Sequence, residues 1–196
     1  MKFIYLLFLV FLFLNCGSKK EIYNLPTFSN NNTVNCIVEI PSGTNRKFEY
    51  NKESKKFEID LIEGKERVIQ FLSYPANYGF ITSTYSNPAI GGDGDALDII
   101  VISEAVKTGT VIETIPIGVL KLIDNNEYDY KIIAVPVKEE LRIISALSFR
   151  ELEQNYPKIL DILEIWFLNY DSRDSLTTEG WGDEKEAIKE IRKSIK

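Results

Sequence analysis

Three aspartates between residues 93 and 98 are the strongest chemical signal in the sequence. They lie in the run Gly91-Gly92-Asp93-Gly94-Asp95-Ala96-Leu97-Asp98, directly before an apolar segment. Two carboxylates about 4 Å apart repel by ~4 kcal/mol at an effective dielectric of roughly 20, so acids that share one cleft stay ionised only when cations bind them. Oxygen ligands favour hard metals, Mg²⁺ before Zn²⁺. The run therefore predicts a divalent-cation site.

Two alternatives compete for this run. A solvated acidic turn would account for it if it stood alone. A calcium-binding EF-hand loop counted from Asp93 needs a ligand at its fifth position and glycine at its sixth, where this chain has Leu97 and Asp98. The EF-hand interpretation fails at these two positions, although Glu104 does fall at the twelfth.

A second group of charged residues surrounds the loop Asn125-Asn126-Glu127-Tyr128. Asp124 and Asp129 bracket this loop, and Lys131 follows on the same strand face as Asp129. Segments closer to the N-terminus add Glu39, Lys47 and Glu49. Acids and bases from distant parts of the chain are what a binding site on a barrel requires. Carboxylates that hold metals beside Lys and Arg predict a site for a polyanion such as a phosphate.

The composition excludes several other kinds of chemistry. The chain has 196 residues, the length of one domain, with 23 Lys and Arg against 29 Asp and Glu, a net charge of −6. Histidine is absent, which excludes Ser-His-Asp and Cys-His mechanisms and His-ligated metals. The acidic balance predicts no nucleic-acid partner. The two cysteines, Cys16 and Cys36, cannot build a disulfide framework, and Cys36 is expected to be a small buried hydrophobe.

The N-terminus has the pattern of an export signal. Lys2 precedes an apolar run over residues 3–14, which is shorter than the roughly 20 residues of a membrane-spanning helix. The run ends in Phe13-Leu14-Asn15-Cys16-Gly17-Ser18, which resembles a bacterial lipobox, although Phe13 and Asn15 depart from its usual small residues. We expect a signal peptide over 1–15, lipidation of Cys16, a flexible lipid-anchored tether over 16–33, and a domain over 34–196 in the cell envelope, outside the cytoplasm. An uncleaved signal anchor or cleavage at another site is the alternative.

Short strands must position most of the charged residues. Period-two or apolar patterns predict strands over 34–40, 46–50, 56–61, 99–102, 111–122 and 130–135, with 46–50 and 56–61 forming a hairpin. Helical periodicity appears only late, over 149–152, over 159–167 after Pro157, and over 187–195. The pattern predicts a mainly β fold, a small barrel with peripheral helices packed on it.

With these segments together, the chain resembles the soluble inorganic pyrophosphatases that have an OB-fold barrel. The matching segments run in family order from about residue 36 to the C-terminus: Glu39-Ile40-Pro41, Lys47-Phe48-Glu49-Tyr50, residues 74–81 (YPANYGFI), residues 93–98 (DGDALD), residues 116–120 (PIGVL), Asp124 through Asp129 to Lys131, and Gly180-Trp181. The resemblance implies a five-stranded OB-fold-like barrel flanked by C-terminal helices. It also implies hydrolysis of pyrophosphate to two phosphates with several Mg²⁺ ions.

The family pattern also implies a role for each site residue. Asp95 is expected to accept the proton of the nucleophilic water, because a carboxylate is a sufficient base once cations have acidified that water. Glu39 and Glu49 would be supporting carboxylates. The direct metal ligands would be Asp93, Asp98, Asp124 and Asp129. The phosphate-binding groups would be Lys47, Arg67, Tyr78, Lys131 and Tyr170.

The chain departs from the family pattern at several positions. The family has an arginine directly after the strand that ends at Asp60, where this chain has Leu61, so Arg67 takes that role here. A Tyr-Lys pair of the family is replaced by Tyr170-Asp171, which should weaken substrate binding unless Arg173 reaches the same place. Two further changes, Ala96 and Thr82 in place of prolines, affect only loop stiffness.

Three other functions remain open at this level: a non-catalytic module that binds phosphate or divalent cations, a hydrolase of short polyphosphate, and an oligosaccharide or nucleic-acid binder of the OB type. The last would need an exposed aromatic platform with basic flanks, and the acidic site disfavours it. The resemblance also implies a homo-oligomer, since bacterial members are commonly hexamers, although a lipid on every chain would restrict assembly.

Overall fold

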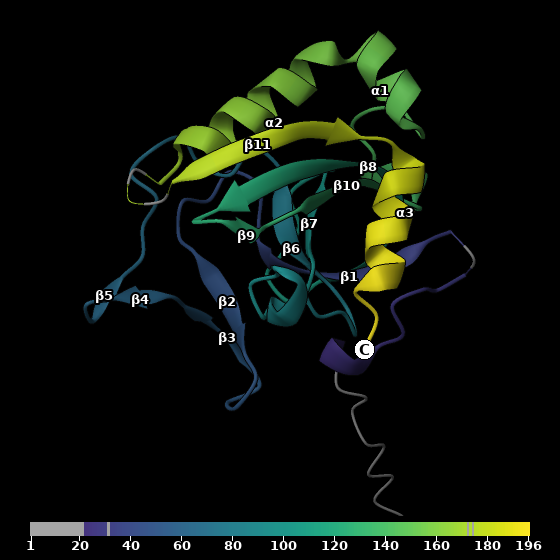
Figure 1. Ribbon diagram of the computed structural model, residues 1–196. Coiled ribbons are helices and arrows are strands. Elements are labelled where there is room, and N and C mark those ends of the chain that lie inside the picture. The colour runs from purple at the N-terminus through teal and green to yellow at the C-terminus, as the bar shows by residue number, and fades with distance from the viewer. Residues whose placement is uncertain (1–21, 31, 172, 174) are drawn as a thin grey trace, which may run out of the picture.

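The computed structural model describes residues 22–30, 32–171, 173 and 175–196, and most of its strands precede its α-helices along the chain (Figure 1). The longer strands are β1 (Val34–Ile40), β2 (Phe48–Asn51), β3 (Lys56–Ile59), β6 (Asn77–Ile81), β7 (Asp98–Val101), β8 (Val111–Asp124), β10 (Lys131–Pro136) and β11 (Leu176–Gly182). The two-residue strands are β4 (Leu61–Ile62), β5 (Lys65–Glu66) and β9 (Glu127–Tyr128). The helices are α1 (Phe149–Asn155), α2 (Pro157–Asn169) and α3 (Glu184–Lys193), with 3₁₀ turns η1 (Ile22–Asn24), η2 (Pro88–Ile90) and η3 (Glu139–Leu141).

Five of the described strands close a ring in the order β1-β6-β7-β10-β8, and β8 pairs back to β1. All pairs are antiparallel except β7 with β10, which run parallel. The hairpin β2–β3 forms a separate two-stranded sheet beside the ring. The predicted mainly β fold, with a five-stranded OB-fold-like barrel and C-terminal helices, is confirmed.

The strands of the ring alternate between two buried clusters. On β7, Ile99 and Val101 belong to the cluster that contains Ala187 and Ile191 of α3, while Ile100 belongs to the cluster under α2. This alternation follows from the period-two geometry of a strand. The helices α2 and α3 therefore cover the two apolar sides of the same strands, as Figure 1 shows.

Close packing between β1 and β6 depends on Gly79. A Cβ atom at this position would lie 1.9 Å from the carbonyl oxygen of Ile37, so only glycine permits the two backbones to approach this closely. The register shift between Val38 and Ile40 makes Glu39 the extra residue of a β-bulge. The bulge turns the Glu39 carboxylate toward the hairpin β2–β3, where it accepts a backbone hydrogen bond.

The predicted element boundaries differ from the structure in three places. The strand expected over 56–61 divides into β3 and β4, and the chain returns through β5. The strand β8 continues past Pro116 and Gly118, because a register shift against β10 accommodates the proline. Two of the longer strands, β6 and β11, were absent from the predicted strands, and the Thr-Thr-Glu-Gly stretch of β11 carries little apolar periodicity.

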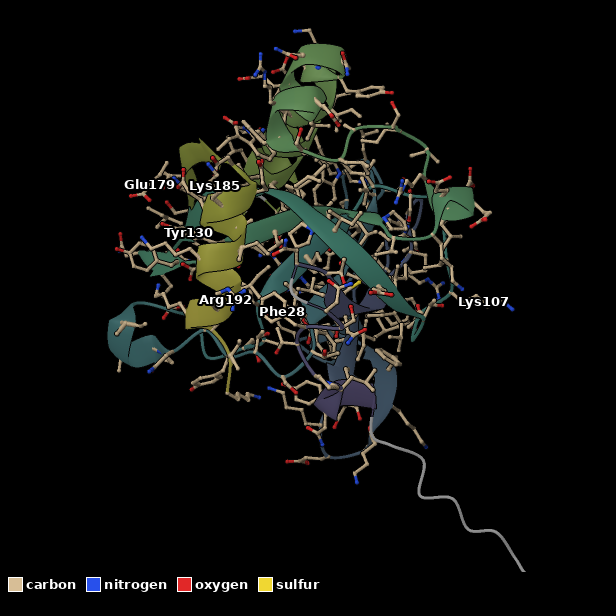
Figure 2. The ribbon with its side chains drawn as sticks, turned by 90° about the vertical axis from the view of Figure 1, so that its right-hand side faces the viewer. Phe28, Lys107, Tyr130, Glu179, Lys185 and Arg192 are labelled. Atoms are coloured by element: carbon tan, nitrogen blue, oxygen red, sulfur yellow. The ribbon has the colours of Figure 1, made fainter. Side chains whose placement is uncertain are left out.

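The segment before β1 is packed on the domain, so the expected tether is shorter than 16–33. Thr27 is buried and donates its hydroxyl to the Thr82 carbonyl over 2.9 Å. Phe28 pairs with Val34 and lies against the guanidinium of Arg192 on α3 (Figure 2). These bonds place Tyr23 through Asn30 in the folded unit, contrary to the expected domain boundary at residue 34. The predicted signal peptide, Cys16 and the rest of the tether lie outside the described residues.

Within the described part of the chain, no helix has both the length and the apolar character needed to cross a membrane.

Candidate functional site

One pocket of about 320 Å³ contains all of the described side chains that the sequence singled out for chemistry. Its acidic lining includes Asp93, Asp95, Asp98, Asp124 and Asp129, together with Glu39 and Glu49. The predicted phosphate-binding groups Lys47, Arg67, Tyr78, Lys131 and Tyr170 line the same pocket. The predicted convergence of distant charged segments is confirmed, while the role of each residue stays a prediction.

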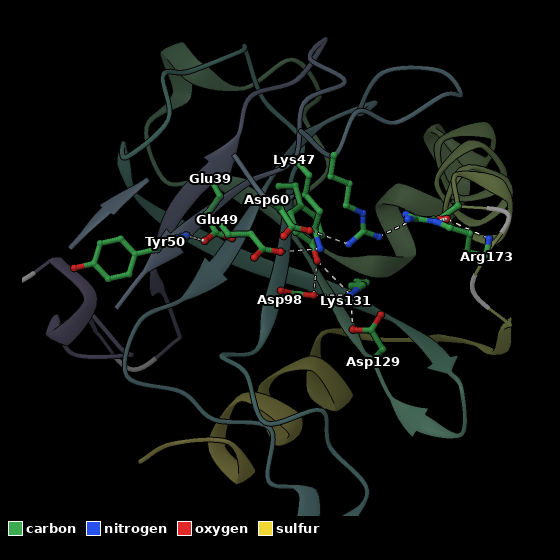
Figure 3. Close-up of polar contacts among 12 residues, drawn as sticks. Glu39, Lys47, Glu49, Tyr50, Asp60, Asp98, Asp129, Lys131 and Arg173 are labelled. Atoms are coloured by element: carbon green, nitrogen blue, oxygen red, sulfur yellow. Dashed lines mark hydrogen bonds and ion pairs between the residues drawn. The ribbon is translucent and has the colours of Figure 1, made fainter. Parts of the chain in front are cut away.

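The parallel pairing of β7 and β10 places Asp98 beside Lys131. These residues are register partners at the N-terminal ends of the two strands. The Lys131 ammonium is buried and bonds the carboxylates of both Asp98 and Asp129, and the Tyr78 hydroxyl donates to Asp98 (Figure 3). Burial lowers the pKa of Lys131, but the two carboxylates outweigh it and raise that pKa overall. The ammonium therefore stays charged at the floor of the pocket.

Burial and mutual repulsion hold several of the acids close to protonation. Burial raises the pKa of Asp93 to about 6, with the charges of Asp98 and Asp129 adding to the effect. Burial also raises the pKa of Asp98, against the attraction of Lys131. The Asp93 carboxylate accepts a hydrogen bond from the Asp95 backbone N–H over 2.9 Å, and Gly94, at φ +86°, makes the turn that exposes both acids.

The hairpin β2–β3 contributes a second set of charges. The Lys47 ammonium lies 2.8 Å from the Glu49 carboxylate, as expected for residues two apart on one strand face. Glu39 accepts a hydrogen bond from the Tyr50 N–H over 2.7 Å, and burial raises the pKa of Glu39 to about 8. The Lys47 pKa is also raised, because Glu49 outweighs the effect of burial. Glu39 thus ties the hairpin to the ring, and Glu49 orients Lys47.

Arg67 reaches the pocket as predicted, and Asp171 holds it there. Its guanidinium lies 2.8 Å from the Asp171 carboxylate and 3.3 Å from that of Asp60. Arg173 binds the same carboxylate, and its bonds hold the pKa of Asp171 below the usual range. The neighbouring Tyr170 ring stacks on Trp166 with centroids 4.8 Å apart. The substitution of the family's lysine by Asp171 therefore buries an anion between two arginines.

Two pocket residues were missed by the sequence interpretation. Tyr23 comes from the segment that was expected to be a tether, and Lys52 from the turn of the β2–β3 hairpin. The Lys52 ammonium lies 3.3 Å from the Asp95 carboxylate. The sequence marks both segments only as polar and irregular. Strand spacing could not have placed Lys52 in the site, because a separation of five residues from Lys47 predicts the opposite face of a strand.

The donor set of this pocket fits hard divalent cations. Seven acidic and four basic side chains line it, so negative charge exceeds positive charge even while Glu39 keeps its proton. An anionic substrate would be repelled unless cations joined it. Among the described residues no three acidic, cysteine or histidine side chains are already arranged to hold a metal ion, and the Lys131 ammonium bridges Asp98 and Asp129 instead. Burial raises the pKa values of Asp93 and Asp98, and the negative charges of neighbouring aspartates add to this effect.

Comparisons with known proteins agree with this geometry. A family model described as "Inorganic pyrophosphatase" matches residues 36–196. The inorganic pyrophosphatase of Neisseria meningitidis is 34% identical over 166 residues, covering 83% of this chain and 86% of that protein. The Campylobacter jejuni protein of the same name is 33% identical, covering 91% of this chain and 96% of its own. The inorganic pyrophosphatase structure from Coxiella burnetii superposes with a TM-score of 0.74 at 29% identity, covering 87% of this chain and 98% of that one.

Proposed function

The chain belongs to the inorganic pyrophosphatase family and hydrolyses pyrophosphate to two phosphates, and we propose that the pocket at the ends of β7 and β10 is where it does so. The observation that carries this proposal is the convergence of acids and bases from residue 39 to residue 170 on one cavity. The family generally uses divalent metal ions. We propose Mg²⁺ for this chain, because the acidic side chains of the pocket offer carboxylate oxygens, the ligands that Mg²⁺ prefers.

The aspartates would hold the ions. Asp93, Asp98, Asp124 and Asp129 all line the pocket: Asp98 begins β7, Asp124 ends β8, and the other two lie in the loops before β7 and β10. When bound there, Mg²⁺ supplies positive charge that offsets these acids and makes water more acidic. This accounts for a pocket that lacks any histidine.

Asp95 is the proposed proton acceptor. Its side chain is 75% exposed, so a proton taken from the attacking water passes readily to solvent. The fixed turn from Asp93 to Asp95 holds its backbone in place. Glu39 and Glu49 would have supporting roles. Glu39 would hold the hairpin through its hydrogen bond from Tyr50, and Glu49 would orient the Lys47 ammonium.

The cationic and phenolic groups would bind the phosphates. Lys47, Arg67 and Lys131 would supply positive charge where charge develops on the leaving phosphate, and the Tyr170 hydroxyl would add a donor. The Tyr78 hydroxyl donates to Asp98 in this structure and would turn to a phosphate only when a cation binds Asp98. Because Lys131 pairs with Asp98 and Asp129 in this structure, cations at those acids would leave the ammonium available to the substrate. Metal and substrate binding would then be coupled through one lysine.

A phosphate-release assay on the full chain in detergent tests the proposal. Pyrophosphate with Mg²⁺ should turn over, and Asp95→Asn should lower kcat by about 100-fold or more, the range expected for a lost general base. No turnover above the Asp95→Asn variant would instead favour a non-catalytic binding module. Tripolyphosphate in a parallel assay distinguishes a polyphosphatase, which would turn over the longer substrate faster.

We also propose that Cys16 carries a lipid that anchors the chain to a bacterial membrane, outside the cytoplasm. The support is the lipobox-like run and the position of η1, which starts at residue 22. Six residue steps separate Cys16 from Ile22, which fully extended span about 20–22 Å at most. The domain would therefore lie close to the membrane surface. Metabolic labelling with a fatty acid should be lost in Cys16→Ser, and unchanged labelling or none would refute this anchor.

Oligomeric assembly, which the resemblance implies, remains a prediction that light scattering on the purified chain can check.

A further inference from the structure

The site pocket has a wall that lies outside the family-matched residues. Tyr23 lines the pocket, although the family model begins at residue 36. The side chain is partly buried and belongs to η1.

Specific bonds fix the segment that carries Tyr23. The carbonyl of Leu25 accepts from the Ser83 hydroxyl over 2.8 Å, and that of Pro26 accepts from the Asn35 side chain over 2.8 Å. The backbone N–H of Asn35 donates to the Thr27 carbonyl over 2.9 Å. The segment is therefore bonded on both sides to the loop after β6 and to β1, and Tyr23 enters the pocket from a fixed backbone.

Tyr23 joins the separate hairpin to the ring. Its ring stacks on Tyr50 of β2 at 5.5 Å with an angle of 13°, and lies 5.2 Å from Phe80 of β6. The hairpin β2–β3 shares no strand pairing with the ring among the described residues, and a two-stranded hairpin by itself is only marginally stable. The aromatic contact is thus one of the features that set where the hairpin turn lies.

The hairpin turn carries Lys52, and Tyr23 also contacts this side chain. The Lys52 ammonium lies 5.8 Å from the centroid of the Tyr23 ring and 3.3 Å from the Asp95 carboxylate. The Tyr23 hydroxyl accepts a hydrogen bond from the ammonium of Lys196, at 3.3 Å. Lys52 is therefore kept at the mouth of the pocket, beside the acid proposed to receive the proton.

We propose that Lys52 is a further phosphate-binding residue of the pocket and that Tyr23 is its positioning residue. This inference rests on the proposed function of the pocket. The other basic side chains of the pocket, Lys47, Arg67 and Lys131, are less exposed than Lys52, while the exposed Asp95 would repel an entering anion. A cation fixed beside Asp95 offsets this repulsion on the path of pyrophosphate into the site.

Steady-state kinetics on the full chain with pyrophosphate and Mg²⁺ tests the proposal. Lys52→Gln and Tyr23→Ala should each raise KM about 3- to 5-fold, the upper range for an exposed ion pair, and leave kcat within about twofold. The double variant should show no larger KM than Lys52→Gln alone, because Tyr23 acts through Lys52. Tyr23→Phe keeps the stacked ring and should stay closer to wild type than Tyr23→Ala.

Two control variants match these changes. Lys56→Gln removes an exposed positive charge from the same hairpin at a position that does not line the pocket, and Tyr85→Ala removes the other aromatic ring that Lys196 contacts. Both should keep the wild-type KM. An unchanged KM in Tyr23→Ala, or effects of Tyr23→Ala and Lys52→Gln that add in the double variant, would overturn the proposal.

Amide hydrogen exchange gives a readout that does not depend on turnover. Backbone amides of residues 48–59 should exchange faster in Tyr23→Ala than in wild type or Tyr85→Ala, and equal exchange would show that Tyr23 does not position the hairpin. Absence of turnover by the wild-type chain would overturn the proposed function instead, and the exchange comparison would still decide the positioning role.

Discussion

Asp98 and Lys131 are register partners on the parallel strands β7 and β10, and the Lys131 ammonium is buried between the Asp98 and Asp129 carboxylates. Parallel strands bring their N-terminal ends to the same edge of the ring, so a single strand pairing brings together an acid and a base that lie 33 residues apart. The same contact offsets part of the negative charge of these two carboxylates when no metal is bound.

Lys131→Met should therefore destabilise the metal-free protein strongly. Removing one partner of a buried ion pair leaves an uncompensated charge, which costs about 3–5 kcal/mol. Urea unfolding in EDTA measures this loss, and Mg²⁺ should recover part of it in the variant, because the cation replaces the missing positive charge.

Lys121→Met is the matched control for that experiment. Lys121 also pairs with an acid, Glu186, but the Glu186 side chain is half exposed, so the loss should be about 0–1 kcal/mol. Equal destabilisation by the two variants, or no recovery with Mg²⁺, would contradict the role given to Lys131.

Glu39 makes the stability of the metal-free protein depend on pH. Burial raises its pKa from 4.5 to about 8. Below pH 4.5 the carboxyl is protonated in both the folded and unfolded states. Between these values the unfolded state ionises while the folded state keeps its proton, so this group lowers the free energy of unfolding as pH rises, by at most ~1.4 kcal/mol per pH unit.

Glu39→Gln should remove this contribution, because the amide oxygen still accepts the Tyr50 hydrogen bond without a titratable charge. The stability difference in favour of the variant should grow from about pH 5 to about pH 8 and then level off. Chemical unfolding in EDTA across this range measures it, with the exposed Glu153→Gln of α1 as a control. A difference that is constant with pH would show that Glu39 ionises normally in the fold.

Gly79→Ala should prevent closure of the ring. The added Cβ would meet the Ile37 carbonyl at 1.9 Å, and since both atoms belong to paired backbones, neither can move without breaking the β1–β6 pairing. We expect a loss of at least about 3 kcal/mol or no soluble protein. Circular dichroism and thermal unfolding report the outcome.

Gly43→Ala is the control for Gly79→Ala, because it tests the cost of backbone strain without a steric clash. A Cβ atom added at Gly43 would have nothing within 4 Å, and only the φ of +81° disfavours alanine there, by about 1–2 kcal/mol. A Gly79→Ala protein as stable as Gly43→Ala would mean that the two strands are not held this closely in solution.

The site was largely predictable from the sequence because its residues occur in short, dense motifs. The density of aspartates from Asp93 to Asp98 is enough to indicate a functional site. The two-residue spacing of Lys47 and Glu49 is enough to predict that they share a strand face. Four of the five ring strands followed from period-two or apolar patterns, whereas β6 was not predicted from its pattern. Arg67 lines the pocket as expected, although the loop that carries it is longer than the family pattern.

What the sequence did not reveal depends on contacts rather than periodicity. The residues from Tyr23 to Asn30 are polar and irregular, and they belong to the fold because their backbone groups bond to β1 and to the loop after β6. The strand β11 pairs with β8 while carrying threonines and a glycine. From the sequence, Asp171 appeared only as the loss of the family's phosphate-binding lysine. Its burial beside Arg67 shows that the carboxylate holds the Arg67 guanidinium in place.

Asp171→Asn should release that hold. The carboxylate binds both Arg67 and Arg173, and a lost hydrogen bond to a charged group costs about 1.5–3 kcal/mol. Because the pKa of Asp171 lies below its usual range, this stabilisation is fully present above about pH 4 and is lost only as pH falls further. In urea unfolding, the free energy of unfolding of the variant should therefore lie below that of wild type by a constant amount from about pH 5 to about pH 8. The difference should narrow in stronger acid. Since the neutral amide of this variant leaves Arg67 less restrained, KM for pyrophosphate should rise while kcat changes little. A variant as stable as wild type at neutral pH would contradict this.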